Sequence, residues 1–133
     1  MDVKNDLGGG KPTLLIAEDE ESNYLLLKTI LHKYCNLIRP KTGLEALALF
    51  KENEVDLILM DIKMPVMDGY EATAEIRKVS SNVPIIAVTA YAFAQDEQRI
   101  IKSGFDAYTA KPINGKVLKD KISTLLTHRI ILM

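Results

Sequence analysis

Short apolar runs alternate with amphipathic segments of helical length from residue 13 to about residue 127. The first run, residues 13–17, is apolar on both of its alternating faces, which is typical of a parallel strand covered by helices on both sides. The pattern predicts five strands, at residues 13–17, 36–39, 55–60, 85–88 and 105–109. Because a helical segment follows each strand, and crossovers between parallel strands are right-handed, the pattern predicts an α/β fold with a doubly wound, five-stranded parallel sheet.

The helical segments carry apolar residues three and four positions apart, which is the spacing of one helix face. The residues predicted to face the sheet are, in the first segment, Tyr24, Leu27, Leu31 and Tyr34; in the second, which begins at Gly43, Leu44, Leu47 and Ala48; in the third, Gly69, Ala72, Ile76 and Val79; and in the last, Leu118, Ile122 and Leu125. The fourth segment, residues 94–103, is more polar, and Gly104 is predicted to end it in a left-handed conformation.

The two ends of the chain fall outside this alternation. Residues 1–11 are polar and include three consecutive glycines, which indicates a flexible linker or a cloning remnant. Residues 128–133 are interpreted as a C-terminal tail, for which the pattern predicts no element. One domain is therefore predicted, at residues 12–127, which agrees with a total length of 133 residues.

The composition narrows the class of protein. Hydrophobic residues make up 47% of the chain and charged residues 26%, which is typical of a globular domain. The net charge is −1, so the chain lacks the basic excess typical of nucleic-acid binding, and we expect no direct nucleic-acid partner. The single cysteine and the absence of an apolar run of roughly 18 residues predict a cytoplasmic location and no membrane span.

Candidate chemistry lies at the carboxyl ends of the predicted strands, where doubly wound sheets bind their ligands. Those ends carry Glu18, Asp19, Asp61, Thr89 and Lys111. Three carboxylates at one sheet edge repel one another unless a hard cation such as Mg²⁺ holds them together. A hydroxyl and an ammonium can hold phosphoryl oxygens, and an aspartate can carry phosphate covalently. The pattern therefore predicts phosphoryl chemistry at an acidic Mg²⁺ site.

Each of these residues also has a structural explanation when it is taken alone. Acids at residues 18–21 suit the first turn of a helix, and a single Asp, Thr or Lys after a strand is often a turn residue or a solvated one. The functional interpretation depends on co-occurrence, because four separate strand ends carry the required groups. His32 and His128 lack acidic partners at metal-ligand spacing and are interpreted as surface or packing residues.

The segment with the most specific pattern is LILMDIKMPVMDG, at residues 57–69. It resembles the phosphorylation loop of the receiver domains of bacterial two-component response regulators. The segments IAEDE at residues 16–20, AVTA at 87–90 and AKP at 110–112 resemble the family's acidic, hydroxyl and lysine motifs, in the same order. The resemblance covers about residues 12–127 and implies a flavodoxin-like (βα)5 fold with strand order 2-1-3-4-5.

The resemblance also implies the roles of the site residues. Asp61 would accept a phosphoryl group from a phosphohistidine, and Thr89 and Lys111 would bind the phosphoryl oxygens. The implied Mg²⁺ ligands are Glu18, Asp19, Asp61 and the backbone carbonyl of Lys63. Tyr108 would be the aromatic switch residue that follows the phosphorylation state, and the peptide bond between Lys111 and Pro112 would be cis.

The implied partners are a histidine kinase or a histidine phosphotransfer domain, and a downstream protein at the face formed by residues 94–103, residues 105–109 and the last helix. The acidic segment and residues 68–73 look most like receivers fused to hybrid sensor histidine kinases. The domain would then be the cytoplasmic part of a membrane protein. Alone, it is expected to be a monomer or weak dimer, and not an enzyme beyond assisting its own phosphorylation and dephosphorylation.

Two alternatives stay open at this point. A haloacid-dehalogenase-like phosphatase would need a second aspartate two residues after the nucleophile, where this chain has Lys63. A receiver-shaped scaffold without phosphate chemistry would be expected to lack the acceptor, the lysine or the acidic pair. All of these are present, as Asp61, Lys111, and Glu18 with Asp19. The resemblance also implies that Lys63 and Tyr91 would flank the path of the hydrolytic water. Neither side chain orients water well, which predicts slow decay of a phosphorylated state.

Overall fold

The computed structural model of the chain describes residues 10–90 and 94–132, and the side chains of residues 10–90 and 96–127. Strands and helices alternate along these residues: β1 (Thr13–Ala17), α2 (Glu21–Leu31), β2 (Asn36–Ile38), α3 (Gly43–Glu52), β3 (Leu57–Asp61), α4 (Gly69–Val79), β4 (Ile85–Thr89), α5 (Ala94–Lys102), β5 (Ala107–Ala110) and α6 (Gly115–Leu132). All neighbouring strands pair in parallel, in the order β2-β1-β3-β4-β5. The predicted fold class and strand order are both confirmed.

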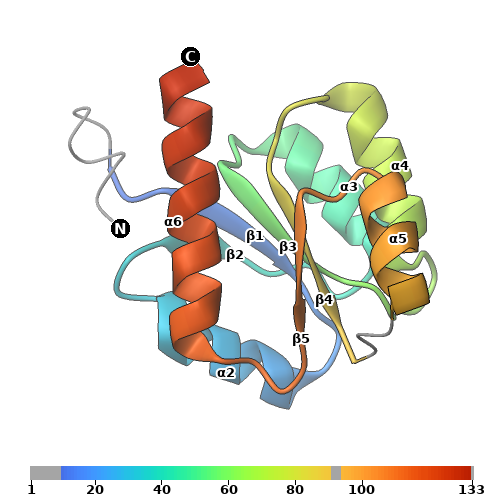
Figure 1. Cartoon of the computed structure of the whole chain (residues 1–133), viewed down its shortest axis with the longest axis horizontal. Coiled ribbons are helices and arrows are strands. Elements are labelled where there is room, and N and C mark those ends of the chain that lie inside the picture. The colour runs from blue at the N-terminus through green and yellow to red at the C-terminus, as the bar shows by residue number, and fades with distance from the viewer. Residues whose placement is uncertain (1–9, 91–93, 133) are drawn as a thin grey trace.

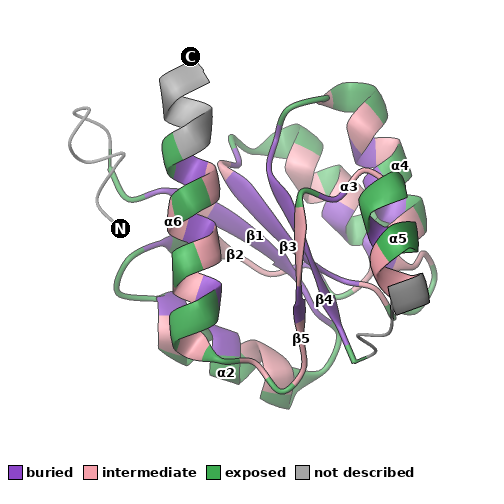
Figure 2. Ribbon diagram, viewed as in Figure 1, coloured by how far each residue is buried: buried purple, intermediate pink, exposed green. Residues whose placement is uncertain are grey.

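The helices form a layer on each face of the sheet (Figure 1). Alternate strand residues explain this arrangement, because successive side chains point to opposite faces. Leu15 and Ile58 share a core with α3, α4 and α5, whereas Leu14 and Leu57 share a second core with α2 and α6. The central strands are buried along their length (Figure 2). The sheet is therefore covered on both sides, and its functional groups are left at the strand ends.

Some residues predicted to face the sheet are exposed: Tyr34, Leu44, Ala48 and Val79. Tyr34 lies beyond the end of α2, at Leu31. In α3 the buried residues are Gly43 and Ala46, because the Gly43 amide donates to the Met67 carbonyl and turns that side of the helix inward. The buried stripe of α4 consists of Gly69, Ala72, Thr73 and Ile76. Because an α-helix rotates by about 100° per residue, Val79 lies at the edge of that stripe. The prediction that Val79 is buried was wrong.

Strands β3 and β5 begin two residues later than predicted, although Val55 and Phe105 are buried. In each case an aspartate lies between the buried residue and the start of the strand, and its carboxylate binds the first residue of the neighbouring strand. An oxygen of Asp56 accepts from the Thr13 amide at 2.7 Å, and an oxygen of Asp106 accepts from the Ile85 amide at 2.8 Å. These carboxylates satisfy the first donors of β1 and β4, so the ladder begins after them.

The final helix, α6, extends to Leu132 and so includes residues 128–132, for which the sequence predicted no element. Gly104, after α5, has a φ of 100°, which confirms the predicted left-handed residue. The peptide bond between Lys111 and Pro112 is cis, as the resemblance implied. The proposed domain boundaries themselves stay predictions.

Val66, in the loop after β3, has a φ of 71° and is 79% exposed. A left-handed conformation is costly for a β-branched residue and is well tolerated by asparagine. We expect Val66→Asn to raise the free energy of unfolding by about 1 kcal/mol, as measured by urea denaturation. The exposed helical residue Val79 supplies the control, since Val79→Asn relieves no such strain. No gain from Val66→Asn would contradict the strain argument.

Candidate functional site

The carboxyl ends of β1, β3, β4 and β5 lie together at one end of the sheet, at the bottom of the view in Figure 1. Asp61 and Thr89 are the last residues of β3 and β4. Glu18 and Asp19 directly follow β1, and Lys111 directly follows β5. Parallel pairing keeps these ends level, so the structure brings the five predicted residues to one place.

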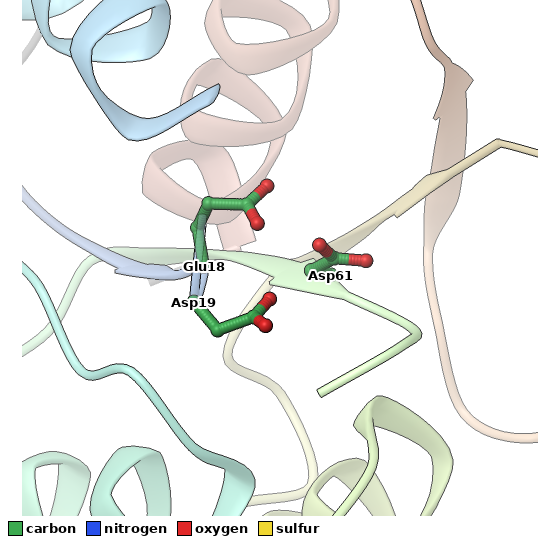
Figure 3. Close-up of side chains that lie close together, drawn as sticks. All are labelled: Glu18, Asp19 and Asp61. Carbon is green, nitrogen blue, oxygen red and sulfur yellow. The ribbon is translucent and has the colours of Figure 1, made fainter. Parts of the chain in front are cut away.

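The carboxylates of Glu18, Asp19 and Asp61 point toward a common space (Figure 3). One oxygen from each lies within 4.8 Å of the others. Glu18 is 1% exposed and Asp61 is 5% exposed, whereas Asp19 faces solvent. Two backbone amides hold the buried pair: that of Glu20 donates to Glu18 Oε2 at 3.2 Å, and that of Lys63 donates to Asp61 Oδ1 at 3.1 Å. The cluster is thus open to solvent on the Asp19 side.

Lys111 supplies the positive charge of the site. Its Nζ lies 3.0 Å from Asp61 Oδ2 and 3.4 Å from Glu18 Oε1. Its backbone amide donates to the Thr89 carbonyl at 2.8 Å, which fixes it to the end of β4. Burial lowers the pKa of Lys111, but the hydrogen bond and charge of Asp61, together with the charge of Glu18, outweigh burial and raise that pKa. The ammonium therefore stays protonated, and one cation faces three carboxylates.

Glu18 is the carboxyl group that the site perturbs. Burial, followed by the close approach and charge of Asp61, raises the pKa of Glu18 from 4.5 to about 7, against the opposing effects of the Glu20 amide and Lys111. Glu18 Oε1 is buried and has no hydrogen-bond partner, since its 3.4 Å approach to Lys111 is an ion pair without hydrogen-bond geometry. An unsatisfied buried carboxylate oxygen facing two further carboxylates fits a hard divalent cation.

The raised pKa of Glu18 predicts a pH dependence of stability. Below about pH 4.5 the carboxyl is protonated in both the folded and the unfolded chain, and above that pH the unfolded chain loses the proton first. Without divalent cations, this residue should therefore lower the free energy of unfolding as the pH rises toward about 7, by an amount on the order of 3 kcal/mol. Urea denaturation in EDTA between about pH 5 and 8 tests this, with Glu18→Gln as the control that lacks the titration. Equal pH profiles for the two proteins would contradict the assignment.

Thr89 and Tyr108 lie on neighbouring strands. Tyr108 pairs with Ala87, and residues two apart in a strand share a face, so Tyr108 and Thr89 are on the same side of the sheet. The Tyr108 hydroxyl donates to the Glu97 carboxylate of α5, which raises the pKa of the tyrosine. Lys121 of α6 donates to the Tyr108 carbonyl and lies 5.2 Å from the centre of its ring. Tyr108 thus connects α5 with α6 beside Thr89.

The sequence did not indicate three of the residues around the site. Arg39 donates to the Glu18 carbonyl, and Glu97 and Lys121 bind Tyr108. Their only signal was polar character at the end of a strand or on a helix, which is ordinary for a surface.

Tyr91 lies outside the described residues, and the side chain of Lys63 is exposed, so slow decay of a phosphorylated state stays a prediction.

A cleft of about 550 Å³ opens beside the carboxylates, between the loop after β3 and α5. Its charged lining includes Asp19 and Lys63 at the acidic end and Arg99 of α5, whose guanidinium carbon lies 3.9 Å from the centre of the Tyr70 ring. The remaining lining residues are Ile62, Met64, Pro65 and Asp68. The acidic cluster is therefore reached from an open surface.

A family model described as the response regulator receiver domain matches residues 14–123. The chain is 42% identical over 127 residues to hybrid signal transduction histidine kinase I of Dictyostelium discoideum, covering 88% of this chain and 7% of that protein. It is 34% identical over 123 residues to the sensor protein GacS of Pseudomonas syringae pv. syringae, covering 88% of this chain and 14% of that one. It is 41% identical over 105 residues to the response regulator DivK of Brucella ovis, covering 77% and 85%. The chain thus spans a small part of the Dictyostelium kinase and of GacS, and most of DivK.

Solved structures agree with these similarities. The receiver domain of a sensor histidine kinase from Pseudomonas aeruginosa PAO1 has a TM-score of 0.83 at 30% identity, covering 89% of this chain and 99% of that one. That structure has a magnesium ion coordinated in its active-site cleft. A receiver domain protein from Methanospirillum hungatei has a TM-score of 0.86 at 29% identity, covering 93% and 100%.

Proposed function

Since the chain belongs to the family of response regulator receiver domains, which act in two-component signal transduction, we propose that Asp61 is its phosphoryl acceptor. The observation that carries the proposal is the position of Asp61, whose buried carboxylate lies beside the carboxylates of Glu18 and Asp19 and 3.0 Å from the Lys111 ammonium. A carboxylate held beside a cation can act as a nucleophile toward phosphorus.

The acidic cluster is proposed to hold Mg²⁺ through Glu18, Asp19, Asp61 and the backbone carbonyl of Lys63. The unsatisfied Glu18 oxygen and the convergence of three carboxylates support this assignment, as does the magnesium ion in the Pseudomonas aeruginosa receiver. When bound, the cation offsets the negative charge of the transferring phosphoryl group. Carboxylates with one exposed member, Asp19, suit a cation that retains water ligands.

The protein's own residues then act on the phosphoryl group. An Asp61 oxygen forms a bond to phosphorus as the bond from phosphorus to the histidine nitrogen breaks, and the electron pair of that bond returns to the imidazole. Lys111, now 3.0 Å from Asp61 Oδ2, is placed to donate to a phosphoryl oxygen, and the Thr89 hydroxyl can donate to another. Positioned charge, and not acid–base catalysis, supplies most of this chemistry.

The proposal is tested by incubating the full chain with acetyl phosphate and measuring its intact mass. With Mg²⁺ present we expect the gain of one phosphate, and with EDTA we expect none. A histidine kinase or phosphotransfer domain carrying phosphohistidine should donate to the same residue. Phosphate gain that is indifferent to EDTA would contradict the assignment of the metal site.

We propose further that phosphorylation repacks α5, β5 and α6. Movement of Thr89 toward the phosphoryl group would leave space that the Tyr108 ring can enter, at the cost of its bond to Glu97. Addition of beryllofluoride is expected to shift amide resonances at the site and across α5, β5 and α6. Shifts confined to the loop around Asp61, with Thr89 and Tyr108 unchanged, would contradict the switch.

Receiver domains interact with histidine kinases or phosphotransfer partners, and we propose the face of α5, β5 and α6 as the site for a downstream protein. The hybrid histidine kinase of Dictyostelium discoideum supports an origin in such a kinase, whereas DivK, which the chain covers to 85%, supports a free-standing regulator. Within residues 10–90 and 94–132, no helix combines the length and apolar character that a membrane span requires. A cytoplasmic setting agrees with the buried free thiol of Cys35. Oligomeric state and the lack of further enzymatic activity stay predictions.

A further inference from the structure

Arg39 directly follows the edge strand β2, yet its side chain is only 12% exposed. Its Nε donates to the backbone carbonyl of Glu18 at 2.8 Å, and its Nη1 donates to the Glu21 carboxylate at 3.0 Å. The guanidinium carbon also lies 4.5 Å from the centre of the Tyr24 ring. One side chain therefore contacts the acidic pair's backbone and the first turns of α2.

These contacts continue the connection between β1 and β2 beyond their ladder. The last paired residues of the two strands are Leu15 and Ile38. Beyond it, the Glu18 amide donates to the Pro40 carbonyl at 3.1 Å, while the Glu18 carbonyl accepts from Arg39. Both backbone polar groups of Glu18 are thus bound by residues 39 and 40, which limits the rotation of the peptide units on either side of it.

The positive charge of Arg39 also suits its position beside the acidic residues 18–21. Residues 18–21 are four consecutive acids, and Lys111 approaches them from the side of Asp61. Arg39 approaches from the opposite side of the segment and pairs with Glu21, whose pKa this pairing lowers. The planar guanidinium can donate to a carbonyl and to a carboxylate while its face stacks on a ring. A lysine would keep the charge and lose this geometry.

We propose that Arg39 is a positioning residue for the divalent cation site, because it fixes the backbone from which the Glu18 and Asp19 carboxylates reach toward Asp61. The inference rests on the proposed Mg²⁺ site. Arg39 contributes no ligand, so its loss should weaken cation binding and leave a site that a higher Mg²⁺ concentration still fills. Groups that orient metal ligands commonly change metal affinity about tenfold to 100-fold when they are replaced.

The test is a Mg²⁺ titration of the full chain followed by amide chemical shifts, which needs no phosphorylation. Arg39→Lys and Arg39→Gln are expected to raise the dissociation constant for Mg²⁺ at least about tenfold. Arg77 provides the matched control, since it is 19% exposed, pairs with Asp106 and donates to the backbone carbonyl of Val83, away from the acids. Arg77→Lys should change the Mg²⁺ dissociation constant by less than about twofold.

Two further measurements separate positioning from loss of fold. Circular dichroism establishes that each variant is folded at the titration temperature. Glu21→Ala, which removes the carboxylate that accepts from Arg39 without changing Arg39 itself, should weaken Mg²⁺ binding in the same direction. Saturating Mg²⁺ should restore phosphorylation of Arg39→Lys by acetyl phosphate to the level of the unchanged chain. Dissociation constants for the Arg39 variants equal to that of the unchanged chain would overturn this inference alone. An unchanged chain that binds no Mg²⁺ at Glu18, Asp19 and Asp61 would overturn the proposed function as well.

Discussion

Replacement of Asp61 by asparagine is expected to reduce phosphate incorporation from acetyl phosphate to background. Asp61→Asn keeps the size of the side chain but removes the carboxylate that attacks phosphorus, and an amide oxygen is a far weaker nucleophile. Glu18 and Asp19 remain, yet neither is the last residue of β3 or accepts from the Lys63 amide. The intact mass after incubation with acetyl phosphate and Mg²⁺ measures the effect.

A matched substitution supplies the control for this experiment. Asp120 is an exposed aspartate on α6, so Asp120→Asn makes the same chemical change away from the site and should leave phosphate gain unchanged. Asp61→Asn should also lower the pKa of Glu18, because the Asp61 charge is one of the causes that raise it. Its unfolding free energy should then depend less on pH. Phosphate gain by Asp61→Asn equal to that of the unchanged chain would show that another residue is the acceptor.

The second large effect is expected from Gly69→Ala. Gly69 is the first residue of α4, and its amide donates to the Ile62 carbonyl at 2.9 Å. A β-carbon at this position would lie 2.4 Å from the Asp61 carbonyl oxygen and 2.8 Å from the Ile62 α-carbon. These are backbone atoms, which cannot rotate away, so we expect a loss of about 3 kcal/mol in the free energy of unfolding. Displacement of the Asp61 backbone should also reduce phosphate gain.

Gly115→Ala is the corresponding control, because Gly115 also begins a helix. A β-carbon there would lie 3.5 Å from the Ile30 side chain, which is ordinary contact, and alanine favours a helix over glycine. Urea denaturation of the two variants should therefore show a large loss for Gly69→Ala and little change or a small gain for Gly115→Ala. Equal stability of Gly69→Ala and the unchanged chain would mean that the start of α4 can move off the phosphorylation loop at little cost.

Much of the fold follows from local pattern. Five apolar runs separated by helical segments predict a parallel sheet covered on both faces, because parallel strands need crossovers and the crossovers have one hand. The strand order 2-1-3-4-5 came from the family resemblance. Parallel strands also place their carboxyl ends on the same side of the sheet, so the sequence alone could group Asp61 with the other residues that follow the strands. The motif at residues 57–69 then indicated the receiver family, which the family match confirms. The roles of the individual residues stay proposals.

The helix faces were less predictable. Leu44 is as apolar as Leu47, and the periodic pattern alone does not say which of them turns inward. The close approach of Gly43 to the Met67 carbonyl sets the rotation of α3 about its axis and so decides which residues face inward. Similarly, Val55 and Phe105 are buried as strand residues would be, but Asp56 and Asp106 place them before the ladders. Packing between segments outweighs periodicity when a stripe is only a few residues long.

By itself, the sequence determined which chemical groups stand at the carboxyl ends of the strands, because each apolar run and the polar residues after it are local features and all strands of a parallel sheet point the same way. Only the tertiary structure decided the protonation and the hydrogen-bond partners of those groups. The pKa of Glu18 depends on burial and on the distance to Asp61, 43 positions further along the chain. The contact of Arg39 with the Glu18 carbonyl and the bond from Tyr108 to Glu97 depend in the same way on how the layers pack. Electrostatic and hydrogen-bond energies change steeply over a few ångströms, and such separations exist only after the chain has folded.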